Sequence, residues 1–266
     1  MGLSPRGWSR VIRRLHLAVS VVVIAAGVCA TAALAQGFGR RGWRGADIAD
    51  AHVPYDGRFA FVRLRHTVGS GPGGTRGEPP WAHDYPRAER NFSRILQEVT
   101  LIKPHLDESN VFTMDDPELF SYPIAYMSEP GFWLMTDEEL EGMQKYVKKG
   151  GFIIFDDFRG PHFYNFADQV QRIIPGARLV QLDETNAIFH SFFDIRIAET
   201  RGYYGEVTFY GVYENNDPNK RLLLVANHNH DIGEFWEFSG TGFVPVDLTN
   251  DAYKYGVNYV VYAMTH

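Results

Sequence analysis

The distribution of apolar and polar residues along the chain predicts strands that alternate with helices. The apolar run GGFIIFDDFRG, residues 150–160, predicts a buried strand that ends on two aspartates. Similar runs predict further strands at FAFVRLRH, VFTM, PIAYMS, RLVQL, EVTFYGVY and RLLLVANHNH. Strands without polar alternation, separated by helices, indicate a mostly parallel sheet covered on both faces. We therefore expect an α/β fold, a doubly wound three-layer α/β/α sandwich.

Apolar residues at helical spacing predict four helices between and after these strands. The first begins near Asp84, whose side chain we expect to cap it. A capping box from Thr136 to Glu139 opens the second helix. The third is expected at about residues 163–174, and the last begins near Asn250.

The first 35 residues have the pattern of an export signal. Several arginines precede an apolar stretch, and Ala33-Leu34-Ala35 fits a cleavage site before Gln36. We expect residues 1–35 to be removed, residues 36–57 to form a flexible Gly/Arg-rich tether, and residues 58–266 to form one domain. The protein would then be exported to the periplasm or beyond, with no stable membrane span after cleavage. An uncleaved anchor is the alternative, because the apolar stretch is close to the ~20 residues that span a bilayer.

Composition and charge argue against a nucleic-acid partner and against cysteine chemistry. The formal net charge of -6 argues against a nucleic-acid partner, because phosphate binding needs a basic surface. The one cysteine, Cys29, lies inside the signal segment. The mature chain is therefore expected to have no thiol nucleophile, no disulfide and no cysteine metal ligand.

Polar residues gather at the expected carboxyl ends of the strands, where open parallel sheets bind ligands. Asp156 and Asp157 end one strand, and because strand residues alternate between faces, only one of them is expected to face a cleft. That residue would act as a metal ligand or general base, while the other caps the following turn or pairs with a histidine. In the alternative interpretation, both accept backbone N–H groups in the turn. His83 and Asp84, at the start of the first helix, are further catalytic candidates.

The segment NHNHD is a candidate metal site. His228 and His230 are two residues apart, so on an extended backbone both imidazoles would share one face, with Asp231 completing the ligand set. Exposed histidines at a strand end without a metal are the alternative interpretation. Apart from this candidate divalent metal, the sequence predicts no cofactor.

Other polar residues are candidates for ligand binding. Ser128 and Glu129 follow a strand, but the G-x-S-x-G pattern of a nucleophile elbow is absent. The loop VGSGPGGTRG lacks the known phosphate-binding signatures, and it is either an anion site, with Arg76 and Arg87, or a lid. Aromatic residues beside these segments suit stacking on a sugar or peptide, or packing in a core.

Several segments together resemble the bacterial domain-of-unknown-function family numbered 4159. They are FVRLRH, WAHDYPRAERNF, LFSYPIAYMSEPG, GGFIIFDDFRG, IFHSFFD, NHNHDIGEFWE and GVNYVVYAMTH, and the likeness covers about residues 57–266. The resemblance implies a fold similar to class I glutamine amidotransferases, a flavodoxin-like sandwich. Many relatives carry this domain at the end of longer membrane proteins, whereas this chain looks like a stand-alone exported form.

The resemblance does not imply a reaction. Amidotransferases use a Cys-His-Glu triad, and the mature chain has no cysteine, so this activity is excluded. The resemblance offers as site candidates a set of matching residues: His83, Asp84, Arg87, Asp156, Asp157, His190, His228 and Asp231.

Two functions remain open from the sequence. The first is a binding or assembly module of the cell envelope without amidotransferase activity, which holds a saccharide, a peptide or a protein of an envelope complex in a cleft at the strand ends. The second is a metal-dependent hydrolase that acts on an envelope saccharide or a related substrate.

Overall fold

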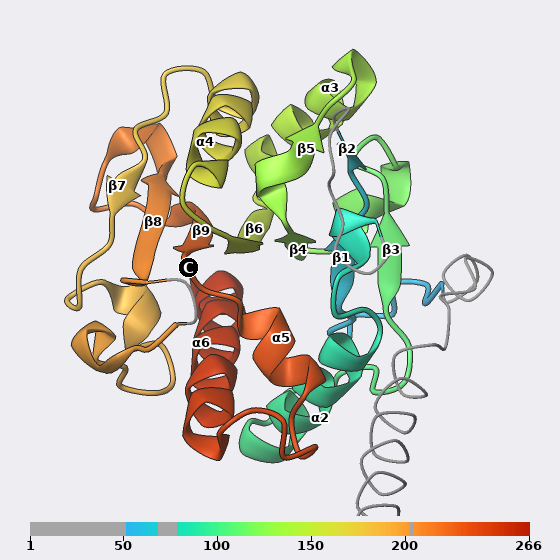
Figure 1. Cartoon of the computed structure of the whole chain (residues 1–266). Coiled ribbons are helices and arrows are strands. Elements are labelled where there is room, and N and C mark those ends of the chain that lie inside the picture. The colour runs from blue at the N-terminus through green and yellow to red at the C-terminus, as the bar shows by residue number, and fades with distance from the viewer. Residues whose placement is uncertain (1–51, 69–78, 203–204) are drawn as a thin grey trace, which may run out of the picture. The chain divides into compact units, whose positions relative to one another are not determined.

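A seven-stranded sheet forms the centre of the protein. The computed structural model describes residues 52–68, 79–202 and 205–266, which lie within one compact unit, Ile48–His266. The strand order is β3-β1-β4-β6-β9-β8-β7 (Figure 1). The parallel strands are β1 (Val62–Leu64), β3 (Asn110–Phe112), β4 (Ile124–Ser128), β6 (Phe152–Phe158) and β9 (Leu222–His228). β8 (Thr208–Tyr213) runs antiparallel to β9 and to β7 (Val180–Gln181), so the sheet is mostly parallel, as predicted.

Some predictions concern residues outside the described ranges. They are the signal segment with Cys29, the cleavage site before Gln36, the tether as far as residue 51, and the glycine-rich loop with Arg76. Among the described residues, no helix has both the length and the apolar character needed to cross a bilayer.

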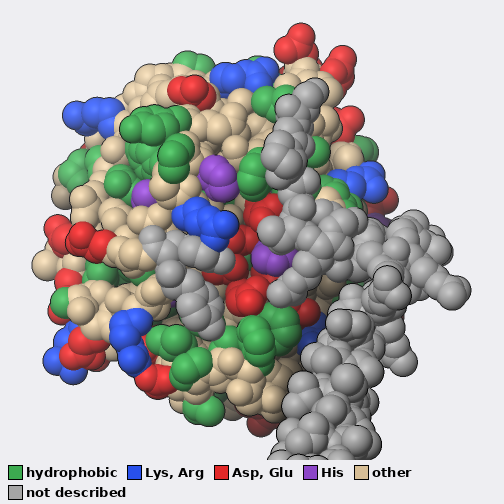
Figure 2. Space-filling model, in the orientation of Figure 1, with side chains coloured by type: hydrophobic (Ala, Val, Ile, Leu, Met, Phe, Trp, Pro, Cys, Tyr) green, Lys and Arg blue, Asp and Glu red, His purple; other side chains and the backbone are tan. Residues whose placement is uncertain are grey.

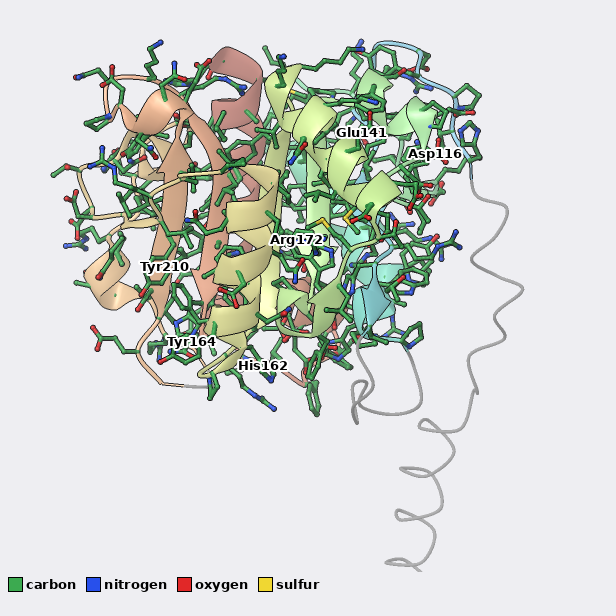
Figure 3. The ribbon with its side chains drawn as sticks, turned by 90° about the horizontal axis from the view of Figure 1, so that it is seen from above. Asp116, Glu141, His162, Tyr164, Arg172 and Tyr210 are labelled. Carbon is green, nitrogen blue, oxygen red and sulfur yellow. The ribbon has the colours of Figure 1, made fainter. Side chains whose placement is uncertain are left out.

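Helices cover both faces of the sheet. α2 (Arg87–Val99), α5 (Ile232–Glu237) and α6 (Val246–Thr265) contribute buried side chains to one hydrophobic core, and α3 (Asp137–Lys148) and α4 (His162–Ile173) contribute to the other. Figure 3 shows α3 and α4 over one face, with Glu141 on α3 and Arg172 on α4. The shorter elements are η1 (Pro80–Ala82), η2 (Pro117–Ser121), η3 (Pro130–Phe132), η4 (Ala187–Phe189), η5 (Ile197–Glu199), η6 (Glu214–Asn216), and the antiparallel pair β2 (Thr67–Val68) and β5 (Trp133–Leu134).

Strand alternation explains why the central strands are apolar on both sides. On β6, Phe152 and Ile154 belong to the core shared with α2, α5 and α6, whereas Ile153 and Phe155 belong to the core shared with α3 and α4. All seven residues of β6 are buried. A strand buried on both faces is expected to form a continuous apolar run, and this run is what predicted the strand.

The helix starts were predicted with mixed success. The capping box at Thr136 and Glu139 is present. The prediction that Asp84 caps the first helix is wrong, because α2 begins at Arg87 with Pro86 at its N-cap and no side-chain capping bond. Asp84 instead has a left-handed backbone, with φ 67°. The last helix begins at Val246, earlier than predicted, and α5 was not predicted at all.

A fully buried arginine on β1 holds the segment that precedes α2. Arg63 Nε donates to the Glu89 carboxylate, and its Nη1 donates to the carbonyl oxygens of Trp81 at 3.0 Å and His83 at 2.7 Å. The guanidinium also lies 4.9 Å from the ring centroid of Tyr126. These bonds fix the backbone of residues 81–83 to the Arg63 side chain of β1.

We expect loss of the Arg63 counterion to destabilise the fold strongly. Glu89→Ala would leave a buried guanidinium charge without its partner, which costs about 3–5 kcal/mol. Urea unfolding should show this loss as a lower midpoint. The matched control is Glu141→Ala, because Glu141 is an exposed glutamate on α3 paired with Lys145, and its midpoint should stay close to wild type. Equal midpoints for the two variants would contradict the structural role of the pair.

Candidate functional site

The two aspartates at the end of β6 point to different surroundings. The pairing of β6 with β9 shifts register between Phe155 and Phe158, and Asp157 within this irregularity has φ 55°. Such a bulge re-aims the side chains that follow it. Asp156 and Asp157 therefore have different partners.

Asp156 binds the sheet to α5. Its carboxylate accepts hydrogen bonds from Tyr126 Oη at 2.8 Å, Asn227 Nδ2 at 2.8 Å and the backbone N–H of Gly233 at 3.0 Å. Burial raises the pKa of Asp156 to about 6, although these three hydrogen bonds act in the opposite direction. A fully buried carboxylate whose oxygens are already bonded has a structural role.

Asp157 faces the neighbouring polar residues instead. Its Oδ2 lies 2.6 Å from Nδ1 of His83 and accepts a long hydrogen bond, 3.5 Å, from Ser128 Oγ. On the other side of the imidazole, Nε2 of His83 lies 3.8 Å from Asp84 Oδ1 and 4.0 Å from Glu234 Oε2. His83 is therefore surrounded by carboxylates from three separate segments.

Four residues form a group that suits a metal ion, and we call them the first ligand group. His83, Asp84, Asp157 and Asp231 each offer one ligand atom, and these atoms lie within 4.8 Å of one another. Asp84 is 3% exposed, and neither of its carboxylate oxygens has a hydrogen-bond partner among the described residues. Figure 2 shows acidic side chains beside a histidine near the middle of the face of the molecule that it draws.

The electrostatics of this group show an excess of negative charge. Burial alone would lower the pKa of His83, but the hydrogen bond to Asp157 and the charges of Asp84, Asp157 and Glu129 raise it to about 10. Burial raises the pKa values of Asp84 and Asp231 well above their usual range, and the charge of Asp157 raises both further. These neighbouring carboxylates therefore disfavour one another's ionisation.

Glu129 lies beside the first ligand group, immediately after β4. Burial and the charge of Asp157 raise its pKa to about 7, against the lowering effects of His83 and Arg159. Its Oε2 is buried without a hydrogen-bond partner in the described part of the chain. A carboxyl group with a pKa near neutrality can both take up and release a proton under physiological conditions.

Backbone strain is concentrated at the same place. Asp84, Glu129 and Asp157 have φ values of 67°, 48° and 55°, in the left-handed region that non-glycine residues rarely adopt. Such conformations cost on the order of 1–3 kcal/mol each and persist where the surrounding structure enforces them. Three of them around one group of side chains favour a functional role for this group.

The histidines of NHNHD are not brought together. Nε2 of His228 lies 3.2 Å from the carbonyl oxygen of Gly160, and its ring packs against Phe163. His230 is buried among aromatic rings that include Phe209. The physical reason is Asn229, whose φ of 59° interrupts the extended backbone on which a shared face depended. Of the predicted set, only Asp231 joins the first ligand group.

Two other predicted residues lie apart from this group. Arg87 is exposed in the first turn of α2. His190, after η4, lies 3.1 Å from Asp194 Oδ1 and 2.6 Å from the carbonyl oxygen of Glu184. Neither is among the partners that the structure gives for the first ligand group.

Sequence reasoning missed Arg63 and Glu237. Glu237 forms a second group of potential ligands with Asp84 and Glu234, again within 4.8 Å of one another. The spacing of Glu234 and Glu237, three residues apart, was a usable signal once a helix was expected, because such residues share one helical face. That helix was missed because its apolar residues directly follow a strand.

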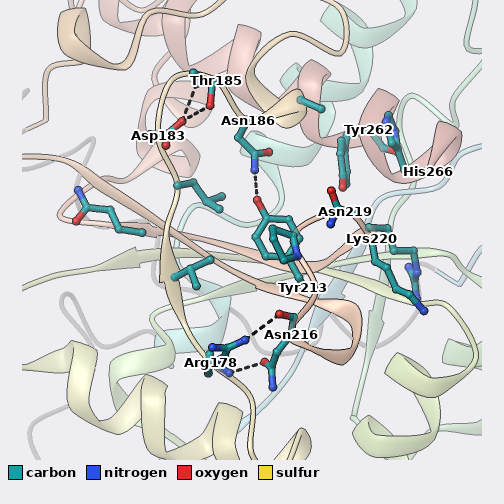
Figure 4. Close-up of a pocket in the computed structure, with 16 residues that line it drawn as sticks. Arg178, Asp183, Thr185, Asn186, Tyr213, Asn216, Asn219, Lys220, Tyr262 and His266 are labelled. Atoms are coloured by element: carbon teal, nitrogen blue, oxygen red, sulfur yellow. Dashed lines mark hydrogen bonds between the residues drawn. The ribbon is translucent and has the colours of Figure 1, made fainter.

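A separate cavity of about 780 Å³ lies between β7, β8 and the end of α6 (Figure 4). Its lining includes Arg178, which donates to Asn216, and Asn186, whose amide bonds the Tyr213 hydroxyl. None of the first ligand group lines this cavity. Some of its lining residues bond to one another, whereas the acidic group at the strand ends contains buried oxygens without a hydrogen-bond partner among the described residues. The acidic group is therefore the stronger functional candidate.

Fold and site define a mixed α/β protein with a carboxylate and histidine centre at the carboxyl edge of a mostly parallel sheet. The family model described as Domain of unknown function (DUF4159) matches residues 60–264, and the chain belongs to that family. A comparison with curated proteins gives no match.

We expect Asp156 to matter for stability. Asp156→Ala would leave the Tyr126 hydroxyl, the Asn227 amide and the Gly233 N–H buried without their acceptor, at a cost of about 1–3 kcal/mol for each unsatisfied group. Thermal unfolding of the metal-free protein should show a large decrease in Tm. Asp157→Ala is the matched control, and it should decrease Tm much less because it removes a carboxylate from an acidic group. The reverse order of Tm values would contradict the assigned roles.

His230 should make the protein sensitive to acid. Burial lowers the pKa of His230 to about 4, so below its ordinary value of 6.5 the unfolded chain binds a proton that the folded protein does not. This stabilising contribution is present above pH 6.5 and is lost as the pH falls toward 4, by up to about 3 kcal/mol. In His230→Phe, the free energy of unfolding should fall less steeply over this range. An unchanged slope would show that His230 does not cause the sensitivity.

Proposed function

We propose that this protein is an exported, divalent-cation-dependent hydrolase that acts on an envelope saccharide or a related substrate. The observation that carries the proposal is the buried carboxylate of Asp84, which has no hydrogen-bond partner among the described residues and lies within the first ligand group. Buried polar oxygens without a hydrogen-bond partner are unfavourable, and a bound metal would give these oxygens a partner. Export rests on the sequence of residues 1–35.

The first ligand group would hold the cation through His83, Asp84, Asp157 and Asp231. One imidazole nitrogen with several carboxylate oxygens suits a cation such as Zn²⁺ or Mn²⁺. The cation would polarise the bond to be hydrolysed and lower the pKa of water. Glu129 would take up the proton of the attacking water, since its pKa of about 7 suits this role.

Contacts with Asp157 and Arg63 would orient the histidine. If His83 binds the cation through Nε2, its Nδ1 remains bonded to Asp157, which holds the imidazole ring in a fixed orientation. Asp157 would then act as a positioning residue as well as a ligand candidate. The Arg63 bond to the His83 carbonyl oxygen fixes the backbone of the same residue.

The second candidate function is an envelope binding module that uses the same edge without turnover. Aromatic residues on and beside the start of α4 favour it: the ring of Phe132, on η3, lies 4.6 Å from that of His162, and Tyr164 is 72% exposed. Figure 3 shows His162 and Tyr164 near one end of α4. Exposed aromatic rings of this kind stack on saccharides or peptides.

We further propose that the fold is a doubly wound three-layer sandwich, flavodoxin-like and similar to the class I glutamine amidotransferases. Numbered along the chain, the five parallel strands have the order 2-1-3-4-5, which supports the proposal. In that order, ligands bind where the strand order reverses, here between β1 and β4. Glu129 directly follows β4, and the Arg63 side chain on β1 holds His83.

Asp84→Asn tests the proposed cation site. Asparagine keeps the shape and tolerates the left-handed backbone, so the metal-free variant should have a Tm equal to or above that of wild type. Wild type should gain Tm with Mn²⁺ or Zn²⁺, and the variant should lose most of that gain. Asp107→Asn, at an exposed aspartate paired with Arg94, is the matched control and should respond to metal like wild type. Metal-free wild-type protein that shows no Tm response to any divalent cation would refute the site.

Glu129→Gln distinguishes the two candidate functions. With a panel of chromogenic esters, amides and glycosides and the activating cation, the hydrolase proposal expects wild-type turnover and a loss of about 10²–10⁴-fold in kcat in this variant. Its metal-dependent Tm gain should remain. A wild-type protein that binds the cation and an envelope saccharide but hydrolyses nothing in the panel would favour the binding module.

A further inference from the structure

We infer that this edge holds two divalent cations bridged by the Asp84 carboxylate, an inference that rests on the proposed cation binding. The first cation would lie in the first ligand group. The second would be bound by Asp84, Glu234 and Glu237, which we call the second ligand group. The two groups share only Asp84.

The position of Asp84 suits a bridge. Its Oδ1 lies 3.8 Å from Nε2 of His83, on the side of the first ligand group. Its Oδ2 lies against α5, where a Cβ atom added to Gly233 would come within 2.6 Å of it. Glu234 is the next residue along α5. One oxygen of the carboxylate thus lies near His83, and the other lies against the start of the helix that carries Glu234 and Glu237.

The lack of partners at Asp84 is the observation that points to bound ions. The side chain is 3% exposed, and both oxygens lack a hydrogen-bond partner in the described ranges. A single cation would engage one oxygen of a monodentate carboxylate and leave the other buried and unpaired. A bridging carboxylate satisfies both.

The charges of the two ligand groups also favour two cations. Together the groups contain five carboxylates: Asp84, Asp157, Asp231, Glu234 and Glu237. With all five ionised and His83 neutral, the formal charge of the two groups is -5, which one divalent cation changes to -3 and two divalent cations change to -1. Buried or half-buried carboxylates this close together need such compensation, because like charges at short range strongly disfavour ionisation.

Gly233 is required by this arrangement. It lies at the start of α5 with its N–H bonded to Asp156 and its Cα side facing Asp84 Oδ2 and the Tyr126 hydroxyl, each 2.6 Å from an added Cβ. Any larger residue would displace the Asp84 carboxylate. Glycine therefore allows α5, with Glu234 and Glu237, to approach Asp84 closely.

A bridged pair of cations would serve hydrolysis. Two-metal sites, with ions about 3.5–4 Å apart, stabilise both the attacking and the leaving oxygen of a displacement. Hydrolysis needs no other reactant than water, which adds across the bond that breaks. A second cation would therefore make the proposed site a two-metal hydrolytic centre.

The test is the number and coupling of Mn²⁺ ions bound by the full chain. Metal-free protein is loaded with Mn²⁺ alone, excess ion is removed, and the bound metal is measured by elemental analysis and electron paramagnetic resonance. We expect two Mn²⁺ per chain and the spectrum of an exchange-coupled pair. Glu237→Gln should decrease the number of bound Mn²⁺ ions to one per chain and give the hyperfine pattern of an isolated ion. Glu141→Gln, on the exposed face of α3, is the matched control and should keep two.

The outcomes separate this inference from the proposed function. One Mn²⁺ per wild-type chain, with an isolated-ion spectrum, overturns the bridge but leaves the proposed cation site in place. No bound Mn²⁺, and no other divalent cation bound, overturns both. If Glu237→Gln unfolds, judged by its circular dichroism, Glu234→Gln replaces it with the same expectation. Two coupled ions retained in both glutamine variants would overturn the assigned second ligand group.

Discussion

The contacts of Arg63 are the constraint on which the rest of the site depends. The guanidinium is fully buried on a central strand and donates to Glu89 on α2 and to the carbonyl oxygens of Trp81 and His83. The partners of a buried charge must keep their positions, because the loss of any one hydrogen bond leaves a buried polar group unsatisfied. The pair therefore fixes the docking of α2 and, through the backbone of residues 81–83, the place of His83 and Asp84.

Two adjacent aspartates at the end of one strand have different partners. Asp156 bonds three donors and holds α5 against the sheet, while Asp157 faces His83. α5, which Asp156 holds in place, carries Glu234 and Glu237, and Asp231 is its N-cap residue. The site is assembled on rigid elements, but its neighbouring buried carboxylates repel one another. The mutual repulsion of these carboxylates and the three left-handed residues are unfavourable features that the surrounding packing enforces.

The sequence predicted the family and the sheet well, and the members of the acidic site only in part. His83, Asp84, Asp157 and Asp231 were all candidates, because each follows or precedes a recognisable element. The prediction that His228 and His230 share one face is wrong, because the left-handed residue between them, Asn229, changes the direction of the chain. Arg63 was missed because an arginine in a strand carries no local signal of burial, and Glu237 was missed because the short helix that carries it was not predicted.

The sequence by itself determined the mostly parallel sheet and the edge where polar residues gather, since apolar runs report burial and period-two alternation reports the faces of a strand. It also determined that no cysteine chemistry is available outside residues 1–35. Only the tertiary structure decided which of Asp156 and Asp157 faces the site and which carboxylates meet His83. The reason is that a bulge, a left-handed residue and the approach of α5 at Gly233 orient side chains by long-range packing, which no local pattern records.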